Sequence, residues 1–311
     1  MSFYYWRTTF SLDSQETHTL RDNAVDTLYV RYFDVDWPAA DTAPSPLAPI
    51  RFETSPAAYT IIPVVYLRNK VFEKLTPAAL PAFAGNVHTL IQRISRSRAI
   101  TPREVQFDCD WTEHTKDIYF QFLRSFRTLS NQELSCTIRL HQIKFPDRTG
   151  IPPVDRGVLM YYNMGAIDAR DNSSIYDKAI AHRYTPFLRS YPLTLDLALP
   201  VFAWGLKVRD GKVVQLLDKM NANLFEKDSS FRLLATNRYR ATRGCFKSGY
   251  YFQAGDQVKI ESVSAGDLEE IVTDVNKNTN RHIRNLIFFD LDRQNLQSYD
   301  KDIYKEILAH T

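Results

Sequence analysis

The chain has 311 residues, of which 44% are hydrophobic and 13% aromatic, so it can bury the core of one large domain. Its 39 basic and 36 acidic residues leave a net charge of only +3 and are scattered, which argues against a nucleic-acid-binding surface. No run is long and apolar enough to span a membrane. Cys109, Cys136 and Cys245 are odd in number and lack metal-ligand spacing, so we expect no disulfide framework, metal or cofactor.

The beginning of the chain bears on where the protein works. No leader peptide is recognisable, yet a strand is predicted to begin at Phe3, almost at the first residue. That abrupt start is typical of a chain whose leader has been removed. We therefore expect an exported protein in the periplasm or at the cell surface, with a lipid anchor as one form of attachment and a cytoplasmic protein as the alternative.

Predicted strands and helices alternate along the chain. Runs of aromatic and β-branched residues predict eight strands, and apolar residues spaced three or four apart predict helices between them. The predicted strands are Phe3–Phe10, Thr27–Trp37, Tyr59–Leu67, Val105–Trp111, Leu134–Gln142, Gly157–Gly165, Leu195–Gly205 and Arg284–Asp292. The predicted helices lie at Ser11–Ala24, Val87–Ile94, Ile118–Phe126, Ile175–Ser190, Leu268–Val275 and Ile303–Leu308. In the first helix, Asp13 and Glu16 have the spacing of a capping box.

This alternation predicts an α/β fold, a (β/α)8 TIM barrel that spans residues 1–311 as a single domain. Several strands are apolar almost throughout, as parallel strands covered on both faces must be. The proline-rich residues 38–56 predict a loop. Residues 207–262 contain short strand-like pieces and predict a small insertion between the seventh strand and its helix, beside the barrel mouth. No glycine-rich phosphate motif follows the first strand, which disfavours a dinucleotide-binding fold.

The stretch Val105–Glu113 carries the strongest chemical signal. Alternation along a strand places Asp108 and Asp110 on one face, and two carboxylates on a buried strand are costly unless they are hydrogen-bonded or functional. A strand end whose aspartates only cap the next helix is the structural alternative. We expect Asp108, the deeper of the two, to be an ionised acceptor tied to Arg139 or to hydroxyls. Barrel enzymes place their chemistry at the C-terminal ends of the strands. The other candidate ligand-binding residues expected at that mouth are Trp6, Asp34, Asp36, Arg139, His141, Tyr162, Asn163, Trp204 and Asp290.

Two motifs resemble the family 18 glycoside hydrolases, the chitinase-like barrels. Asp108 and Asp110 match the second and third aspartates of the family's strand-four motif DGxDxDxE, and Thr112 stands at its catalytic glutamate. Residues 160–163, MYYN, resemble the strand-six motif MxYD, with Asn163 in place of the aspartate. Trp204 resembles the late-strand tryptophan under the bound sugar. The whole chain is also similar to uncharacterised bacterial TIM-barrel proteins that are often exported or lipid-anchored.

The resemblance implies a glycan ligand and puts the family's reaction in doubt. In the family, the glutamate protonates the leaving oxygen and the substrate's acetamido group attacks the anomeric carbon. The hydroxyl of Thr112 is far too weak an acid for that step, and Asn163 lacks the charge that would orient the acetamido group. We therefore expect a barrel that binds a glycan or oligosaccharide and has lost the usual chitinase mechanism.

Three alternatives stay open. The first is an active glycosidase with a relocated acid, for which Asp110 is the first candidate because Asp108 beside it would favour its protonated form. Asp34, Asp36, Asp290 and, if a bulge or turn re-aims it, Glu113 are further candidates, and His141 is a candidate acid, base or sugar-binding donor. The second alternative is a non-catalytic component of a surface assembly. The third is a metal-dependent hydrolase built on the mouth aspartates and His141, which the absence of an HxH motif disfavours.

Overall fold

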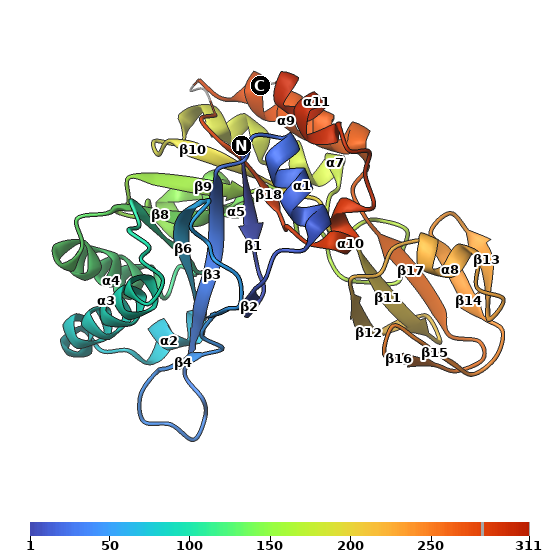
Figure 1. The fold of residues 1–311 in the computed structure, drawn as a ribbon, viewed down its shortest axis with the longest axis horizontal. Coiled ribbons are helices and arrows are strands. Elements are labelled where there is room, and N and C mark those ends of the chain that lie inside the picture. The colour runs from blue at the N-terminus through green and yellow to red at the C-terminus, as the bar shows by residue number, and fades with distance from the viewer. Residues whose placement is uncertain (281–282, 311) are drawn as a thin grey trace.

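Eight parallel strands close into a barrel in the computed structural model, which describes residues 1–280 and 283–310 (Figure 1). The barrel strands are β1 (Ser2–Tyr5), β3 (Thr27–Asp36), β6 (Thr60–Leu67), β7 (Glu104–Asp108), β8 (Glu133–Arg139), β9 (Arg156–Met160), β10 (Leu195–Pro200) and β18 (Leu286–Phe289). Each strand pairs in parallel with its neighbours, and β1 closes the ring by pairing with both β18 and β3. The predicted (β/α)8 barrel is confirmed.

Helices cover the outside of the barrel (Figure 1). They are α1 (Ser14–Asp22), α2 (Asn69–Lys74), η1 (Pro77–Ala79), α3 (Leu80–Arg96), α4 (Lys116–Leu129), α5 (Leu140–Lys144), α6 (Pro146–Thr149), α7 (Lys178–Ala181), η2 (Thr185–Ser190), α9 (Ala265–Asn278), α10 (Arg293–Leu296) and α11 (Ile303–Ala309). The predicted capping box of α1 is present: the Glu16 amide donates to Asp13 at 2.8 Å, and the Asp13 amide donates to Glu16 at 3.0 Å. Residues 37–59, all described, contain β4 (Ser45–Leu47) and β5 (Arg51–Phe52) but no helix.

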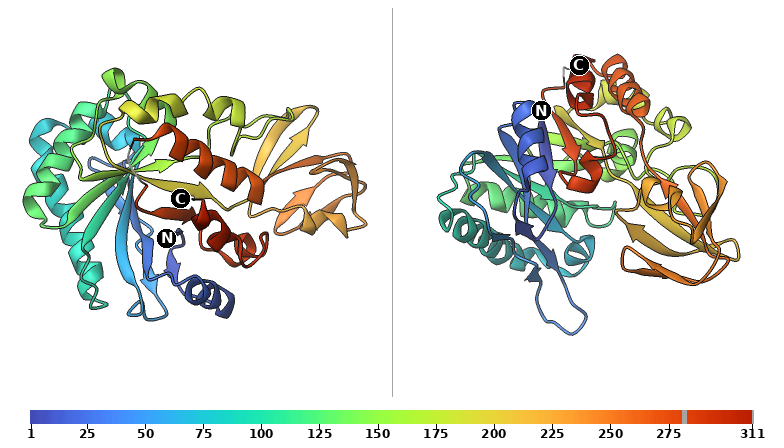
Figure 2. Two further views of the ribbon diagram at one scale, coloured as in Figure 1. Left: turned by 90° about the horizontal axis from the view of Figure 1, so that it is seen from above. Right: turned by 45° about the vertical axis from the view of Figure 1, so that its right-hand side comes forward.

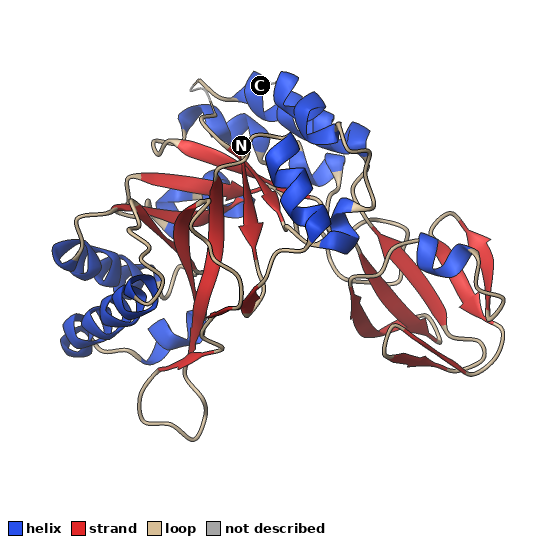
Figure 3. Ribbon diagram, viewed as in Figure 1, coloured by secondary structure: helices blue, strands red, loops and turns tan. Residues whose placement is uncertain are grey.

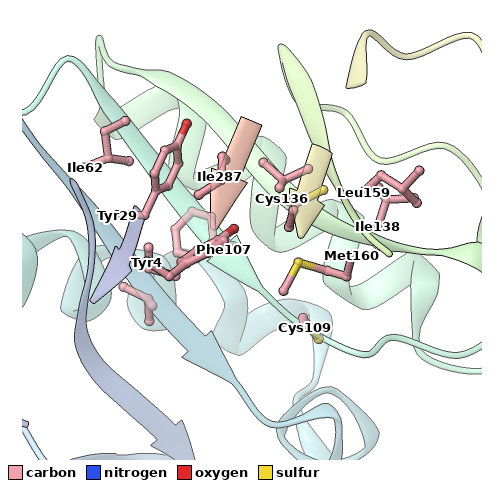
Figure 4. Packing of buried hydrophobic residues seen from close by; sticks show 14 of the residues in the cluster. Tyr4, Tyr29, Ile62, Phe107, Cys109, Cys136, Ile138, Leu159, Met160 and Ile287 are labelled. Carbon is pink, nitrogen blue, oxygen red and sulfur yellow. The ribbon is translucent and has the colours of Figure 1, made fainter. Parts of the chain in front are cut away.

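The two faces of each barrel strand bury different kinds of side chain. On the outer face, Phe107 packs edge-on against Phe122 and Phe126 of α4, at ring-centroid distances of 5.0 and 4.8 Å. On the inner face, the Tyr4 hydroxyl donates to the Gln106 side chain at 2.7 Å across the barrel. Figure 4 shows buried side chains that come from several barrel strands, among them Tyr4, Phe107 and Ile138. Alternate residues of a strand therefore face the helix layer and the barrel interior in turn, as the predicted strands require.

A buried ionic cluster fills the end of the barrel where the strands begin. The Arg156 guanidinium contacts Glu104, and its Nε lies 3.0 Å from Asp196. The Ser135 hydroxyl also donates to Glu104, at 2.5 Å. Burial raises the pKa of Glu104 and that of Asp196 to about 6, although Arg156 opposes both changes. Two buried carboxylates thus share one guanidinium at the end of the barrel opposite the mouth.

The insertion predicted between the seventh barrel strand and its helix is confirmed, and it consists mainly of strands (Figure 3). Its elements are β11 (Trp204–Arg209), β12 (Lys212–Asp218), α8 (Asn223–Glu226), β13 (Phe231–Ala235), β14 (Arg238–Ala241), β15 (Cys245–Lys247), β16 (Tyr250–Phe252) and β17 (Gln257–Glu261). Five of these strands form an antiparallel sheet. Leu217, Phe225 and Phe252 belong to a hydrophobic core of its own. The sheet projects to one side of the barrel (Figure 2).

Polar contacts fasten the insertion to the barrel. Lys219 forms an ion pair with Asp292, just after β18, at 2.5 Å. Glu261 at the end of β17 accepts a hydrogen bond from the backbone amide of Ser174 at 3.1 Å. The insertion therefore contacts both the β18 end and the connection that follows β9.

Several predicted strands are too long at their C-terminal ends. The strand predicted to reach Gly205 ends at Pro200, and Trp204 instead begins the insertion sheet. The strand predicted to reach Gln142 ends at Arg139, because the Gln142 side chain accepts the Arg139 amide at 2.8 Å and starts α5. His141 therefore lies on a helix.

Two other strands, β7 and β9, also end before the residues predicted for them. β7 ends at Asp108, and the buried Trp111 belongs to the following turn, where its indole donates to the Thr149 carbonyl at 2.8 Å. β9 ends at Met160, and Asn163 adopts a left-handed φ of 56°. The sequence prediction extended these strands because their polar ends continue the alternation.

Three further predictions need correction. The strand predicted over Phe3–Phe10 is divided into β1 and the short β2 (Thr9–Phe10). The strand predicted to reach Asp292 ends at Phe289. The helix predicted over Ile175–Ser190 is replaced by α7 and η2, because Pro186 lacks the amide that a continuous helix needs. In the described part of the chain, no helix is both long and apolar enough to cross a membrane.

Candidate functional site

The two aspartates of the central motif lie at the barrel mouth around Arg139. The Arg139 Nε donates to Asp110 at 2.5 Å, and its Nη2 lies 4.0 Å from Asp108. Asp108 is buried and also accepts from the Thr137 hydroxyl at 2.7 Å. Burial raises the pKa of Asp108, with Arg139 opposing. Asp108 was expected to be an ionised acceptor held by Arg139 or by hydroxyls; the contacts match that expectation, whereas the pKa moves towards the neutral acid.

A pocket of about 340 Å³ opens beside these residues, a size common for small-ligand sites. It is lined by Asp110, Arg139, Leu140, His141, Tyr162, Asn163, Met164 and Tyr184. Desolvation lowers the pKa of His141, so its imidazole is neutral at pH 7 and can both donate and accept hydrogen bonds. Burial raises the pKa of Tyr162, which keeps its hydroxyl protonated. The lining therefore offers uncharged donors and acceptors together with the Arg139–Asp110 pair.

A row of aromatic rings crosses the mouth next to this pocket. The rings of Trp6 and Tyr162 each lie 5.5 Å from Phe289, and Phe202 lies 5.7 Å from Tyr162 and 5.2 Å from Trp204. Tyr162 is buried, whereas the other four rings keep part of their surface exposed. The row consequently joins the predicted residues Trp6, Tyr162 and Trp204 into one continuous apolar surface.

Asp34 and Asp36 are held by cations near the mouth. Arg31 donates to both oxygens of Asp34, at 2.7 and 2.5 Å, and its guanidinium lies 5.8 Å from the Trp6 ring centroid. Lys70 contacts Asp36 at 2.7 Å. Burial opposes ionisation of Asp36, but the hydrogen bonds from Lys70 and the Trp37 amide outweigh it, and the pKa is lowered. Both aspartates are thus partners in local ion pairs.

The residues after Asp110 turn away from the pocket. Thr112, at the position of the family's catalytic glutamate, is exposed, and its amide donates to the Thr115 hydroxyl at 2.9 Å. Glu113 pairs with Arg148 at 2.9 Å, and that contact lowers the pKa of Glu113. Neither Thr112 nor Glu113 lines the pocket. The bulge that would have aimed Glu113 inward is absent from this stretch, which the structure describes in full.

Asp290 lies at the mouth end of β18, apart from the pocket lining. It is buried, and the Asn295 amide donates to it at 2.6 Å. Burial, followed by the charge of Asp292, raises the pKa of Asp290 to about 7, against the opposing effect of Lys219. A carboxyl group with such a pKa exchanges its proton near neutral pH, which is a property of general acids.

The structure brings five predicted residues together in the pocket lining: Asp110, Arg139, His141, Tyr162 and Asn163. Asp108 lies directly behind them, whereas Asp34, Asp36, Glu113 and Asp290 have separate partners. Within residues 1–280 and 283–310, no three His, Cys, Asp or Glu side chains are grouped as metal ligands.

Sequence reasoning missed several residues of the site. They are Leu140, Met164, Tyr184, Phe202 and Phe289. Leu140, Met164 and Phe289 could have been found, because they lie near the C-terminal ends of predicted strands. Tyr184 follows a short helix at the far end of a long connection, and no local pattern signals its position.

Comparisons with known proteins fit this architecture. No protein-family model matches the chain, and no curated protein matches its sequence. Solved structures do match. The spore cortex-lytic enzyme SleL of Bacillus cereus has a TM-score of 0.60 at 12% identity, over 99% of this chain and 73% of that one.

Two chitinases are also similar. The chitinase ChiB of Flavobacterium johnsoniae has a TM-score of 0.55 at 11% identity, over 99% of this chain and 92% of that one. A Cycas revoluta chitinase mutant in complex with (GlcNAc)4 has a TM-score of 0.53 at 12% identity, over 99% of both chains. Both are named as members of glycoside hydrolase family 18. The chain therefore has the fold of the chitinase-like (β/α)8 barrels.

Proposed function

We propose that the protein binds a glycan containing N-acetylated amino sugars at the barrel mouth and does not cleave it by the usual chitinase mechanism. The observation that carries this proposal is the state of the two motif aspartates. Arg139 engages both Asp110 and Asp108, while Thr112, at the position of the family's acid, lies outside the pocket. Asp110 is therefore held in an ion pair with Arg139, and no carboxylate lies at the position of the family's acid.

The aromatic row supports a sugar ligand. Trp6, Phe202, Trp204 and Phe289 present partly exposed rings, and such rings combine an apolar face with little conformational freedom to lose on binding. His141 and Asn163 supply polar groups at the edge of the same mouth. The similarity to a chitinase crystallised with (GlcNAc)4 adds to the case for this class of glycan. Such a role fits a protein exported to the periplasm or the cell surface.

Titration calorimetry with chitotetraose, (GlcNAc)4, tests the binding. The wild-type protein should bind, and Trp6→Ala should weaken affinity by about tenfold, since loss of a central aromatic contact typically costs more than 1 kcal/mol. Trp37→Ala is the matched control, because Trp37 lies beyond the end of β3 and stacks with Lys74 instead. Equal affinities of the wild-type protein and Trp6→Ala, with both proteins folded, would argue against binding at the mouth.

A second candidate function is hydrolysis with a relocated acid, and one observation favours it. Asp290 has a pKa of about 7 and lies at the mouth end of a barrel strand, where a general acid could work. If it serves this role, Asp290→Asn should abolish any glycosidase activity and leave chitotetraose binding unchanged. Activity that survives in Asp290→Asn would remove this candidate.

A further inference from the structure

Three aromatic side chains surround a lysine at the edge of the pocket, and we name this group the lysine rim: Lys144, Phe145, Tyr184 and Phe187. The Lys144 Nζ lies 5.3 Å from the ring centroid of Tyr184 and 5.5 Å from those of Phe145 and Phe187. Tyr184 also lines the pocket, so the lysine rim and the pocket share a wall. Two segments build it: α5 with the residue after it, and η2 with the residue before it.

The lysine rim faces solvent. Phe145 is 42% exposed and Phe187 is 38% exposed, so two large aromatic side chains meet solvent beside the pocket. Exposed aromatic surface beside a pocket is a common feature of ligand-binding sites. Phe145 and Phe187 do not belong to the hydrophobic core of the barrel, so packing of that core does not explain their position at the surface.

Lys144 differs from the other cations around the mouth. Arg31 pairs with Asp34, Arg139 pairs with Asp110, and Lys70 pairs with Asp36. Within the described residues, by contrast, no carboxylate lies within 4.0 Å of the Lys144 ammonium, whose recorded contacts are the three rings. The lysine rim thus presents a partly exposed positive charge that is free to meet an anion.

We propose that the glycan runs from the pocket across the lysine rim and that its sugar units carry carboxylate groups, one of which pairs with Lys144. This inference rests on the proposed function and specifies the chemical class of the ligand. The exposed rings of Phe145 and Phe187 offer apolar surface to the sugar rings, while the Lys144 ammonium favours glycans that carry a negative charge. Arg139 already lies near two carboxylates of the protein, those of Asp110 and Asp108, which balance its charge.

Two tetrasaccharides with the same β-1,4-linked backbone form the test. One is chitotetraose, which is neutral, and the other is a peptide-free tetrasaccharide of alternating N-acetylglucosamine and N-acetylmuramic acid, which adds a lactyl carboxylate to alternate units. Titration calorimetry at low salt should give tighter binding for the acidic tetrasaccharide. Lys144→Gln should weaken it by about 3- to 10-fold, the range expected for a partly exposed charge pair, and leave chitotetraose unchanged.

Matched variants control for folding and for general charge. Lys144→Arg should keep the preference for the acidic tetrasaccharide. Lys212→Gln makes the same change in net charge on the exposed β12 of the insertion and should bind like the wild-type protein. Raising NaCl to 0.5 M should reduce the effect of Lys144→Gln, since salt screens exposed charges. Thermal unfolding verifies that every variant is folded.

The outcomes separate the two claims. Binding of chitotetraose without preference for the acidic tetrasaccharide, or equal affinities of the wild-type protein and Lys144→Gln for the acidic one, would overturn the lysine-rim inference and leave the proposed function standing. A wild-type protein that binds neither tetrasaccharide would overturn both.

Discussion

We expect Arg139 to stabilise the barrel mouth chiefly by balancing the negative charge of the buried Asp108. In Arg139→Met, Asp108 would keep its buried position without a cation, whereas Asp110, whose side chain is 51% exposed, would regain water. Because an unpaired buried charge is far more costly than an exposed one, we expect Arg139→Met to lower the free energy of unfolding by about 3 kcal/mol. Most of that loss should depend on Asp108.

Double-mutant cycles with Asp108→Asn and Asp110→Asn assign the loss to its partners. Unit charges 4.0 Å apart, the separation of Arg139 and Asp108, attract by roughly 4 kcal/mol at an effective dielectric constant of about 20. Since desolvation offsets part of this attraction, the measured Arg139–Asp108 coupling should be about 2 kcal/mol. The Arg139–Asp110 contact is shorter but exposed, and its coupling should stay below about 1 kcal/mol.

Urea denaturation of the three single variants, the two double variants and the wild-type protein at pH 8 and pH 5 measures both couplings. Because burial raises the pKa of Asp108, its folded carboxyl group takes up a proton more readily than the unfolded one. A protonated Asp108 needs no cation, so the cost of Arg139→Met should shrink as the pH falls. A larger coupling to Asp110 than to Asp108, or a cost that grows towards pH 5, would refute this reasoning.

Three further changes test the rest of the account by denaturation. Glu104→Gln should raise the free energy of unfolding by about 2 kcal/mol at pH 7.5, and the gain should vanish below pH 4.5. The reason is that folding raises the pKa of Glu104 from 4.5 to about 6. The stability that this carboxyl group contributes is therefore present below pH 4.5 and is lost as the pH rises through 6. A Glu104→Gln protein that is less stable at pH 7.5 would contradict this. Thr137→Val should cost about 1–3 kcal/mol, because it removes the hydroxyl that donates to Asp108; an unchanged urea midpoint would show that this hydrogen bond contributes nothing. Gly157→Ala should cost about 1–3 kcal/mol, because an added Cβ would lie 2.6 Å from the Ile138 side chain on the neighbouring β8, and wild-type stability would mean that β8 yields freely.

The barrel could be predicted because its strands carry a strong periodic signal. Runs such as Tyr59–Leu67 are apolar on both faces, and the helices between them repeat their apolar residues at helical spacing. Strand ends were predicted less well, since the alternation continues past the last paired residue. His141 shows this clearly: it continues the strand pattern in the sequence, yet the Gln142 side chain caps a helix that carries it.

Contacts between distant segments limited the prediction of the site. Pairing of Arg139 with the two aspartates was one of the expected arrangements, because β7 and β8 are neighbours in any such barrel. The cluster of Glu104, Arg156 and Asp196 was not foreseen, because each residue lies at or next to the start of a different strand and none has a local partner. The lysine rim likewise depends on two segments whose packing no sequence period encodes.

Incubation of the wild-type protein with a saturating concentration of chitotetraose, followed by chromatographic quantification of shorter products, tests the central claim most directly. The account predicts that calorimetry detects binding while the tetrasaccharide stays intact over many hours. Release of shorter oligosaccharides at rates typical of enzymes, about 1 per second or faster, would contradict it and would mean that the mouth contains a working acid.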